Sequence, residues 1–509
     1  MSVPADAVLQ FSYVGMVAQE ILIAGQSKID VELITAATDL DEVIVIGYGV
    51  QKKSLVTGAI SKVDADDLEQ NQVRIEQALQ GKTAGVNIMQ ESGSPGGGLT
   101  VRIRGTGTNK NSNPLFVVDG MRTGGIEYLN PNDIASIEIL KDAASAAIYG
   151  AEAANGVVLV TTKSGKKDKS TISYNGYYGV QQARNINEVL NAQQYASYFR
   201  DGLEHELRSK YPNRTDDQIN TAIDVAYPFN PDTLGAGTDW RNEMFAPAPM
   251  QEQNISVTGG NEKTSVFFSG CYLTQDGIVG GSKANFERYT ARLNADHKVK
   301  DWLSVEGKLS FTHFERKSID ENNEFGGVVS NAMNIDPLTP LYYSDTSQFP
   351  DIYKDHIYDN FDDIDNSSLS AGDKGYYGMS EYVQNEIRNP RAQIDNNHNL
   401  YYQDKVVGGV NLALTPIEGL VFKTAYDIDL AYGNNNWWTP RYYYHSVNYN
   451  YLSTVNQTVE RWFTWQWENT LNYSKQFGLH DFNILAGNTL RDYSFYQFGG
   501  LGEGLQEES

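Results

Sequence analysis

The sequence predicts a mainly β protein, in which a small α+β block is followed by one large antiparallel sheet. Between residues 101 and 163, short apolar runs punctuated by glycine surround one Ala-rich stretch, as expected for strands joined by tight turns. After residue 170, long runs alternate apolar and polar residues. In the 509 residues no stretch approaches 18 consecutive apolar residues, so a transmembrane helix is not expected.

Three strands come first in the α+β block. The expected strand at 101–105 alternates its apolar residues with Arg102 and Arg104, and it ends at Gly105. A second strand is expected at 115–118, and the turn signal Asp119-Gly120 stops it. A third alternating run covers 134–140.

A short helix and a fourth strand complete the block. Asp142 is placed to cap a helix that runs through the Ala-rich residues 143–150 and ends at Gly150. Asn155-Gly156 is a strong turn signal, and the strand expected at 157–162 follows it. The order β-β-β-α-β therefore comes from the residues alone, without indicating a function.

The sheet after residue 170 has the pattern of a transmembrane barrel. Runs of about ten residues at 288–296, 303–312 and 420–430 alternate in character, and ten residues suffice for a tilted strand to cross a bilayer. In the first run one face is expected to carry Tyr289, Ala291, Leu293 and Ala295, and the other Arg288, Thr290, Arg292, Asn294 and Asp296. Short turns at 301–302 and 416–419 contrast with a long polar connection at about 318–400. This asymmetry favours a barrel over a soluble β-sandwich.

The aromatic clusters at 437–444 and 461–467 are expected near strand ends, as in the girdles of membrane barrels. Aromatic content alone fits a sugar-binding β-sandwich equally well.

Composition and motifs exclude several classes of function. The net charge of −24 argues against a nucleic-acid partner, and the single cysteine, Cys271, excludes an intramolecular disulfide or a Cys-rich metal site. Gly81-Lys82-Thr83 lacks the first P-loop glycine, since Glu76 stands there, and His205-Glu206 lacks the second histidine of a zinc-protease motif. The acidic run 359–368 lacks the glycine and closing glutamate of a calcium loop. We expect no catalytic residue, no metal site, no cofactor and no enzymatic activity.

The segments VRIRGTG, NPLFVVDG and DIASIEILKDAASAAIYGAEAANGVVLVTTK together resemble the plug domain of TonB-dependent outer-membrane transporters. The sequences of these segments are similar to those of the SusC/RagA branch of these transporters, found in Bacteroidetes-type bacteria. The resemblance implies an α+β plug inside a large antiparallel transmembrane β-barrel, which has 22 strands in the family; about nine are expected here. The residues that match the plug motif are Arg102, Arg104, Gly105, Pro114, Asp119, Gly120, Lys141, Asp142, Tyr149, Gly150, Asn155 and Gly156.

The stretch 39–49, DLDEVIVIGYG, lies just before the plug-like block and resembles the TonB box of this family. An exposed extended segment can pair edge to edge with a partner's sheet, while the alternative is a plain buried strand that ends in a glycine turn. The residues expected to bind TonB are Glu42, Val43, Ile44, Val45, Ile46 and Gly47.

The resemblance also divides the chain. Residues 1–38 look like a remnant of an Ig-like, carboxypeptidase-regulatory-like domain, 39–49 is the TonB-box-like segment, 50–168 is the plug and 169–509 is the first part of the barrel. No signal peptide opens the chain, and about nine strands are too few to close a barrel, so we expect a fragment of a longer protein at both ends.

The function implied by the resemblance is active import across the cell outer membrane, with no part for nucleic acid. The expected substrates are oligosaccharides or peptides, and the expected partners are the TonB–ExbB–ExbD complex, a SusD-like surface lipoprotein and outer-membrane lipid. One alternative is a siderophore or cobalamin receptor on the same barrel, and another is a secreted glycan-binding or adhesion β protein.

We further hypothesise that Arg102 and Arg104 seat the plug on the barrel wall. Their expected partners are the lumen-facing acids Glu306, Asp427 and Asp429. The equally weighted alternative is pairing within the plug, through Asp133 or Glu138.

Overall fold

The computed structural model describes residues 8–11, 19–22, 31, 43–46, 49–52, 60–67, 73–90, 92–167, 170–184, 186–324, 326–358, 375–383, 387–445, 447–478 and 480–504. Two antiparallel pairs, β1 (Val8–Phe11) with β2 (Gln19–Leu22) and β3 (Val43–Ile46) with β4 (Gly49–Lys52), precede the main body. Most of 1–38, together with Glu42, Gly47 and the acidic run 359–368, lies outside the described residues.

The α+β block forms a five-stranded sheet in the order β5-β10-β11-β8-β9. Its strands are β5 (Ile60–Asp64), β8 (Leu115–Val118), β9 (Met121–Thr123), β10 (Ile134–Leu140) and β11 (Val157–Thr162). The hairpin of β6 (Val86–Gln90) with β7 (Leu99–Ile103) and helices α1 (Ile75–Ala78) and α2 (Ala143–Ala146) complete the block. Apolar side chains from most of these elements form one buried core.

The strands expected in this block are present, and two local predictions hold in detail. The Asp142 side chain caps α2 by accepting a hydrogen bond from the Ser145 amide at 2.8 Å. Asp119 (φ 51°) and Gly120 (φ 97°) form the two-residue turn between β8 and β9, with left-handed backbone at both positions. After Ala146 the expected helix tightens into a 3₁₀ segment, Ala147–Ala153, which breaks at Gly150.

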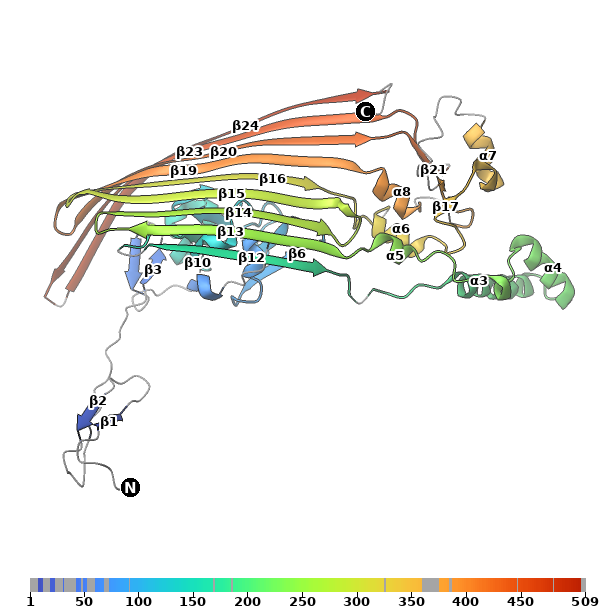
Figure 1. Cartoon of the computed structure of the whole chain (residues 1–509), viewed down its shortest axis with the longest axis horizontal. Coiled ribbons are helices and arrows are strands. Elements are labelled where there is room, and N and C mark those ends of the chain that lie inside the picture. Colours follow the sequence, from blue (N-terminus) through green and yellow to red (C-terminus); the bar gives the residue numbers. More distant parts are fainter. Residues whose placement is uncertain are drawn as a thin grey trace.

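Nine long strands form a single antiparallel sheet, hereafter the wall (Figure 1). Apart from the long excursions, each strand pairs with the next along the chain. The strands are β12 (Thr171–Gln181), β13 (Ala248–Gly260), β14 (Thr264–Gly277), β15 (Gly281–Lys300), β16 (Leu303–Lys317), β19 (His398–Ile417), β20 (Leu420–Thr439), β23 (Thr454–Phe477) and β24 (His480–Glu503).

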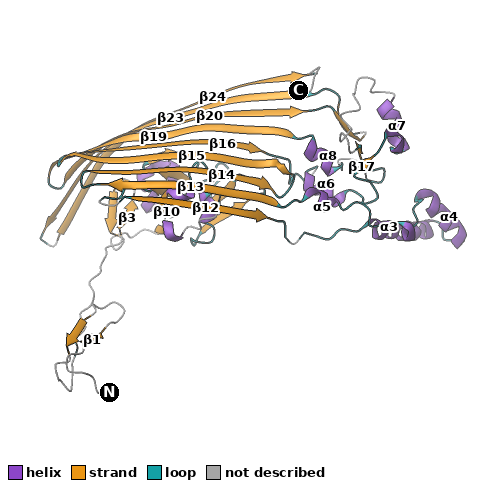
Figure 2. Cartoon of the chain, in the orientation of Figure 1, coloured by secondary structure: helices purple, strands orange, loops and turns teal. Residues whose placement is uncertain are grey.

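Short turns lie at one end of the wall and long excursions at the other, as expected. Residues 301–302 and 418–419 connect strands tightly, whereas helices fill the excursions at the opposite end (Figure 2). Those helices are α3 (Ala192–Lys210), α4 (Asp216–Ala226), α5 (Trp240–Met244), α6 (Val328–Asn334), α7 (Asp351–Tyr358) and α8 (Pro390–Asp395). The excursions also carry two short strand pairs, β17 (Tyr342–Tyr343) with β18 (Tyr376–Tyr377) and β21 (Tyr442–His445) with β22 (Asn448–Asn450). None of the helices described is both long and apolar enough to span a bilayer.

Two expectations about the wall need correction. Several strands are far longer than ten residues, up to the 24 of β23 and β24, and residues 474–477 of β23 extend past the start of β20 at the end of the wall that carries the short turns. The aromatic cluster 461–467 consequently lies in the middle of β23, whereas 437–444 lies at the end of β20 and beyond, as predicted.

Alternation along the wall strands is inverted relative to a soluble protein. On β15 the polar side chain of Asn294 is 1% exposed, whereas its apolar neighbour Leu293 is 42% exposed. The polar face of the strand therefore packs inward against the α+β block, and the apolar face points outward. This is the arrangement of a transmembrane barrel wall.

Candidate functional site

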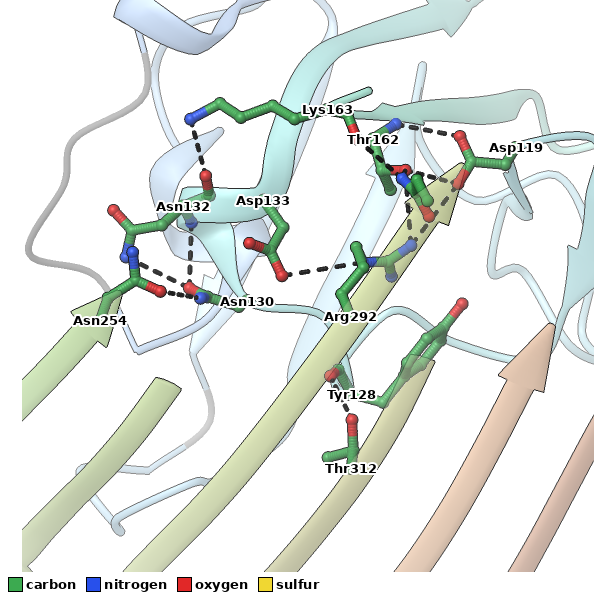
Figure 3. A network of polar contacts seen from close by, with 11 residues as sticks. Asp119, Tyr128, Asn130, Asn132, Asp133, Thr162, Lys163, Asn254, Arg292 and Thr312 are labelled. Carbon is green, nitrogen blue, oxygen red and sulfur yellow. Dashed lines mark hydrogen bonds and ion pairs between the residues drawn. The ribbon is translucent and has the colours of Figure 1, made fainter. Parts of the chain in front are cut away.

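The α+β block sits against the polar face of the wall, and the contacts between them form the candidate site, the plug–wall interface (Figures 1 and 3). We call the block the plug from here on. The centre of the interface is built from three plug segments: the turn after β8, the loop 126–133 and the end of β11. They meet inward-facing side chains of β13, β15, β16 and β23, and β9 adds a contact to β20.

Arg292 of β15 is the central cation. Its side chain is 5% exposed and lies 3.7 Å from both Asp119 Oδ2 and Asp133 Oδ2 of the plug. Lys308 on β16 lies 3.7 Å from the other oxygen of Asp119. Two plug carboxylates are thus held by wall cations in a region from which water is largely excluded, where such attraction is strong.

Asp119 also holds the plug's own structure. Its carboxylate accepts hydrogen bonds from the amide and the hydroxyl of Thr162, at 3.0 and 2.7 Å, and so joins the β8–β9 turn to the end of β11. The Thr162 hydroxyl in turn accepts from Asn294 of the wall at 3.0 Å. The same carboxylate therefore organises the plug edge and meets the wall.

Neutral contacts surround this charge cluster (Figure 3). Asn130 donates to Asn254 at 2.9 Å, and Thr312 donates to the Tyr128 carbonyl at 2.9 Å. Asn294 donates to the Lys163 carbonyl at 2.7 Å. These three contacts are hydrogen bonds, whose groups water can satisfy once the plug leaves. One part of the interface is apolar, because Val73 of the plug packs with Met250, Leu273 and Phe286 of the wall.

Burial at the interface changes the pKa of Asp133, one of the two plug carboxyls that face Arg292. Desolvation raises the pKa of Asp133 above its usual range, and the nearby Arg292 guanidinium opposes this rise. Asp133 Oδ1 also has no hydrogen-bond partner among the described residues.

A second set of contacts extends the interface across β20 and β23. Asp429 accepts from Thr123 of the plug at 3.3 Å and from Lys405 of the wall at 3.0 Å. Gln466 donates to the Gly120 carbonyl at 3.1 Å. The turn of the β8–β9 hairpin and the β9 strand that follows it therefore both contact the wall.

The hypothesis that Arg102 and Arg104 seat the plug is wrong. Arg102 donates to Asn113 at 2.5 Å within the plug, because β7 belongs to the separate β6–β7 hairpin, and Arg104 forms no ion pair with any residue that the structure describes. The alternative partners for the two arginines, Asp133 and Glu138, are not used either.

Two of the three acids proposed as partners of the two arginines are engaged elsewhere, and within the described part of the chain Asp427 forms no ion pair with either arginine. Glu306 pairs with Lys308 at 2.6 Å, and Asp429 pairs with Lys405. The interface therefore has the opposite polarity to that expected: the wall supplies the cations and the plug supplies the carboxylates.

Of the plug-motif residues in the described part of the chain, Asp119 and Gly120 contact the wall through polar groups, whereas Lys141 and Asn155 form hydrogen bonds within the plug. Lys141 donates to Ser61 at 2.6 Å, and Asn155 donates to the Asn111 carbonyl at 3.0 Å. Sequence reasoning missed Asn130, Asp133, Thr162 and Arg292 as a contacting set. Arg292 and Asn294 did share the predicted polar face of β15, and that face marks the interface.

Fold and interface together define a class: a plug domain seated on a membrane-barrel wall. A model of the TonB-dependent receptor plug domain matches residues 52–157. TonB-dependent receptor P26 of Formosa agariphila is 32% identical over 502 residues, which cover 96% of this chain and 45% of that protein. TonB-dependent receptor SusC of Bacteroides thetaiotaomicron is 28% identical over 504 residues, covering 96% and 46%.

Solved structures agree with these relatives. The RagAB peptide importer in its open-open state matches with a TM-score of 0.69 and 28% identity, over 92% of this chain and 50% of that one. The unliganded ferric citrate transporter FecA matches with a TM-score of 0.51 at 9% identity, which shows the fold alone. The chain is thus similar to SusC-like TonB-dependent receptors over nearly its whole length, as its motifs predicted, and it spans less than half the length of these curated relatives. Members of this class are outer-membrane β-barrel proteins.

Proposed function

We propose that this chain forms the gate and part of the wall of a TonB-dependent importer of oligosaccharides or peptides. The observation that carries the proposal is the polar seat of the plug. Arg292, Asp119 and Asp133 hold the plug through ion pairs, and amide and hydroxyl contacts surround them. A gate must stay closed at rest and still leave without exposing a large hydrophobic core. An interface made mainly of polar contacts, with one small apolar cluster around Val73, meets both needs.

The segment that TonB is proposed to bind and pull is the TonB-box-like segment. Val43–Ile46 forms β3, which pairs antiparallel with β4 at the end of the wall that carries the short turns (Figure 1). A strand held in a two-stranded hairpin can exchange its neighbour for the edge strand of a partner, with the backbone hydrogen bonds retained. We infer that TonB, driven by ExbB and ExbD, takes the place of β4, with Glu42 to Gly47 as the contact segment.

Two substrate classes and a lipoprotein lid follow from the relatives. RagAB is described as a peptide importer, and SusC is a curated relative over nearly the whole chain. We therefore propose oligosaccharides or peptides as cargo and a SusD-like lipoprotein above the excursions. A siderophore receptor is the second candidate, although the likeness to FecA concerns the fold alone.

Uptake in cells tests the function and the TonB-box-like segment together. Ile44→Pro removes a backbone N–H and disrupts the strand, whereas the matched Ile44→Val keeps strand character. Labelled oligosaccharides, peptides and a ferric siderophore are offered to cells that carry each form, with and without TonB. We expect uptake of one of the first two classes that is lost in Ile44→Pro and without TonB, and kept in Ile44→Val. Uptake of only the siderophore, or uptake independent of TonB, would contradict the proposal.

A further inference from the structure

The outward face of the wall changes character along its strands. An apolar band crosses four neighbouring strands through Val257, Phe268, Leu293 and Leu309, which pair in register and are all exposed. Four residues before Leu293 on β15, toward the excursions, Tyr289 packs on Tyr272 with ring centroids 4.9 Å apart. Aromatic rings at the edge of an apolar band mark a membrane interface.

Charged groups appear in the same row as these tyrosines. His313 is the register partner of Tyr289, and its Nδ1 lies 2.8 Å from Asp404 of β19. His313 Nε2 lies 3.6 Å from Glu315. The band therefore ends at this row, and the outward face beyond it meets the headgroup region of the outer leaflet.

Beyond this row the outward face carries a hollow of about 560 Å³. Lys317, Leu400, Asn436 and Gln457, which line it, share one register row with Asn285, and Asn285 lies about 13 Å past Tyr289 along β15. The hollow thus lies at headgroup height, on the side of the wall away from the plug.

The charge of the hollow is opposite to that of the chain. The described residues that line it include Lys283 and Lys317 but no carboxylate, in a sequence with 64 acidic and 40 basic residues. Lys317 is exposed and pairs with no carboxylate in the described part of the chain, and Lys283 donates to the Asp395 carbonyl at 2.9 Å. Such a concentration of cationic side chains favours an anionic ligand.

The remaining lining suits a sugar. The rings of His398 and Trp438 lie with centroids 4.3 Å apart and their planes tilted by 53°, and Asn436 and Gln457 supply amide groups beside them. Flat aromatic faces and amides bind the faces and hydroxyls of saccharide rings, while ammonium groups bind phosphate. Leu400 continues the lining toward the bilayer.

We propose that this hollow binds the phosphorylated saccharide headgroup of an outer-leaflet glycolipid, whose acyl chains then run down the apolar band. The inference rests on the membrane placement that the proposed function assumes. A free soluble anion would gain nothing from the neighbouring band, whereas an acylated headgroup buries its chains there.

Binding to the purified receptor in vesicles tests this assignment. The probes are a diphosphorylated, acylated glucosamine disaccharide, the same glycolipid without phosphates, phosphatidylglycerol and inorganic phosphate. The double variant Lys283→Gln/Lys317→Gln is compared with Lys298→Gln/Lys300→Gln, which removes two lysines from the opposite end of the wall. Hydrogen exchange of the plug checks that both variants are folded.

We expect saturable binding of the phosphorylated glycolipid, weakened roughly 30-fold in the first double variant and unchanged in the second. The inference is overturned if phosphatidylglycerol or inorganic phosphate binds as well as the glycolipid, if removing the phosphates changes nothing, or if both double variants behave alike. Uptake is measured on the same variants, because a receptor that binds glycolipid but transports nothing contradicts the proposed function and not the headgroup site.

Discussion

Arg292 of the wall and Asp133 of the plug face each other across the interface, with 3.7 Å between Nε and Oδ2 and side chains that are 5% and 3% exposed. Neither group can recover hydration without movement of the plug. Breaking a buried pair from one side leaves an uncompensated charge, which typically costs about 3–5 kcal/mol. The pair therefore links the seating of the plug to a single cation of the wall.

Replacing Arg292 tests this link. In Arg292→Met, Asp119 and Asp133 lose their shared cation. We therefore expect the free energy that holds the plug against the wall to fall by about 3 kcal/mol. The measurement is leakage of a large antibiotic into cells, together with hydrogen exchange of β8. Arg200→Gln, which removes an Arg–Asp pair on the excursion helices, is the control and is expected to change neither. Equal leakage in both variants would contradict the role of Arg292.

Two substitutions of Asp119 distinguish the contribution of its charge from that of its hydrogen bonds. Asp119→Asn tolerates the left-handed backbone at φ 51° and still accepts from the Thr162 amide, but it loses the attraction to Arg292 and Lys308. Asp119→Ala loses both interactions and strains the turn, at a further cost of about 1–3 kcal/mol. We expect leakage to rise from wild type through Asn to Ala. If the Asn variant leaks as much as the Ala variant, the charge of Asp119 alone holds the plug, and its hydrogen bonds do not contribute.

Much of the plug and the wall was predictable because their signals are local. Asp142 caps a helix, Asp119-Gly120 closes a hairpin, and the alternation around Arg292 separates two faces, each through residues adjacent in sequence. Nine strands and the connection near 318–400 follow from the same alternation and its interruptions.

The pairing across the interface was not predictable because it joins residues far apart in sequence. Arg102 is as charged as Arg292, and alternation alone does not tell which strand edge meets the wall. In the structure the edge that meets the wall carries Thr162, at the end of β11, and Asp133. The α3–α4 excursion was missed because no plug or barrel pattern covers it.

Glu138 makes plug stability depend on pH. Burial raises the pKa of this carboxyl above its usual value, and the Ser136 hydroxyl, 2.9 Å from Oε1, opposes the rise. A raised pKa in the folded state means that the folded protein holds the proton more tightly than the unfolded chain. The stability from the protonated form is therefore complete in acid and is lost as the pH rises through the folded-state pKa.

Glu138→Gln cannot ionise, so the variant does not lose stability at this position as the pH rises. We expect the variant to be more stable than wild type near pH 8, with a difference that shrinks steadily on acidification and vanishes near pH 4. Hydrogen exchange of β10 across this range measures it. The exposed Glu262→Gln, in the turn after β13, is expected to track wild type throughout. A stability difference that grows in acid would reverse the assigned direction of the pKa shift.

Gly156 provides a purely steric test of the plug core. Its φ of +90° is left-handed, and an added Cβ would lie 2.8 Å from Ile103 Cδ1 and 3.1 Å from the Leu140 carbonyl oxygen. Gly156→Ala should therefore destabilise the plug by about 2 kcal/mol or more, through backbone strain and overpacking together. Gly107→Ala is the matched control, because a Cβ there meets nothing within 4 Å. Limited proteolysis of the receptor should cut the plug faster in the first variant and at the wild-type rate in the second. β7, β10 and the start of β11 meet at Gly156. Equal cutting rates in the two variants would therefore show that this junction accommodates a methyl group without loss of plug stability, which contradicts the prediction.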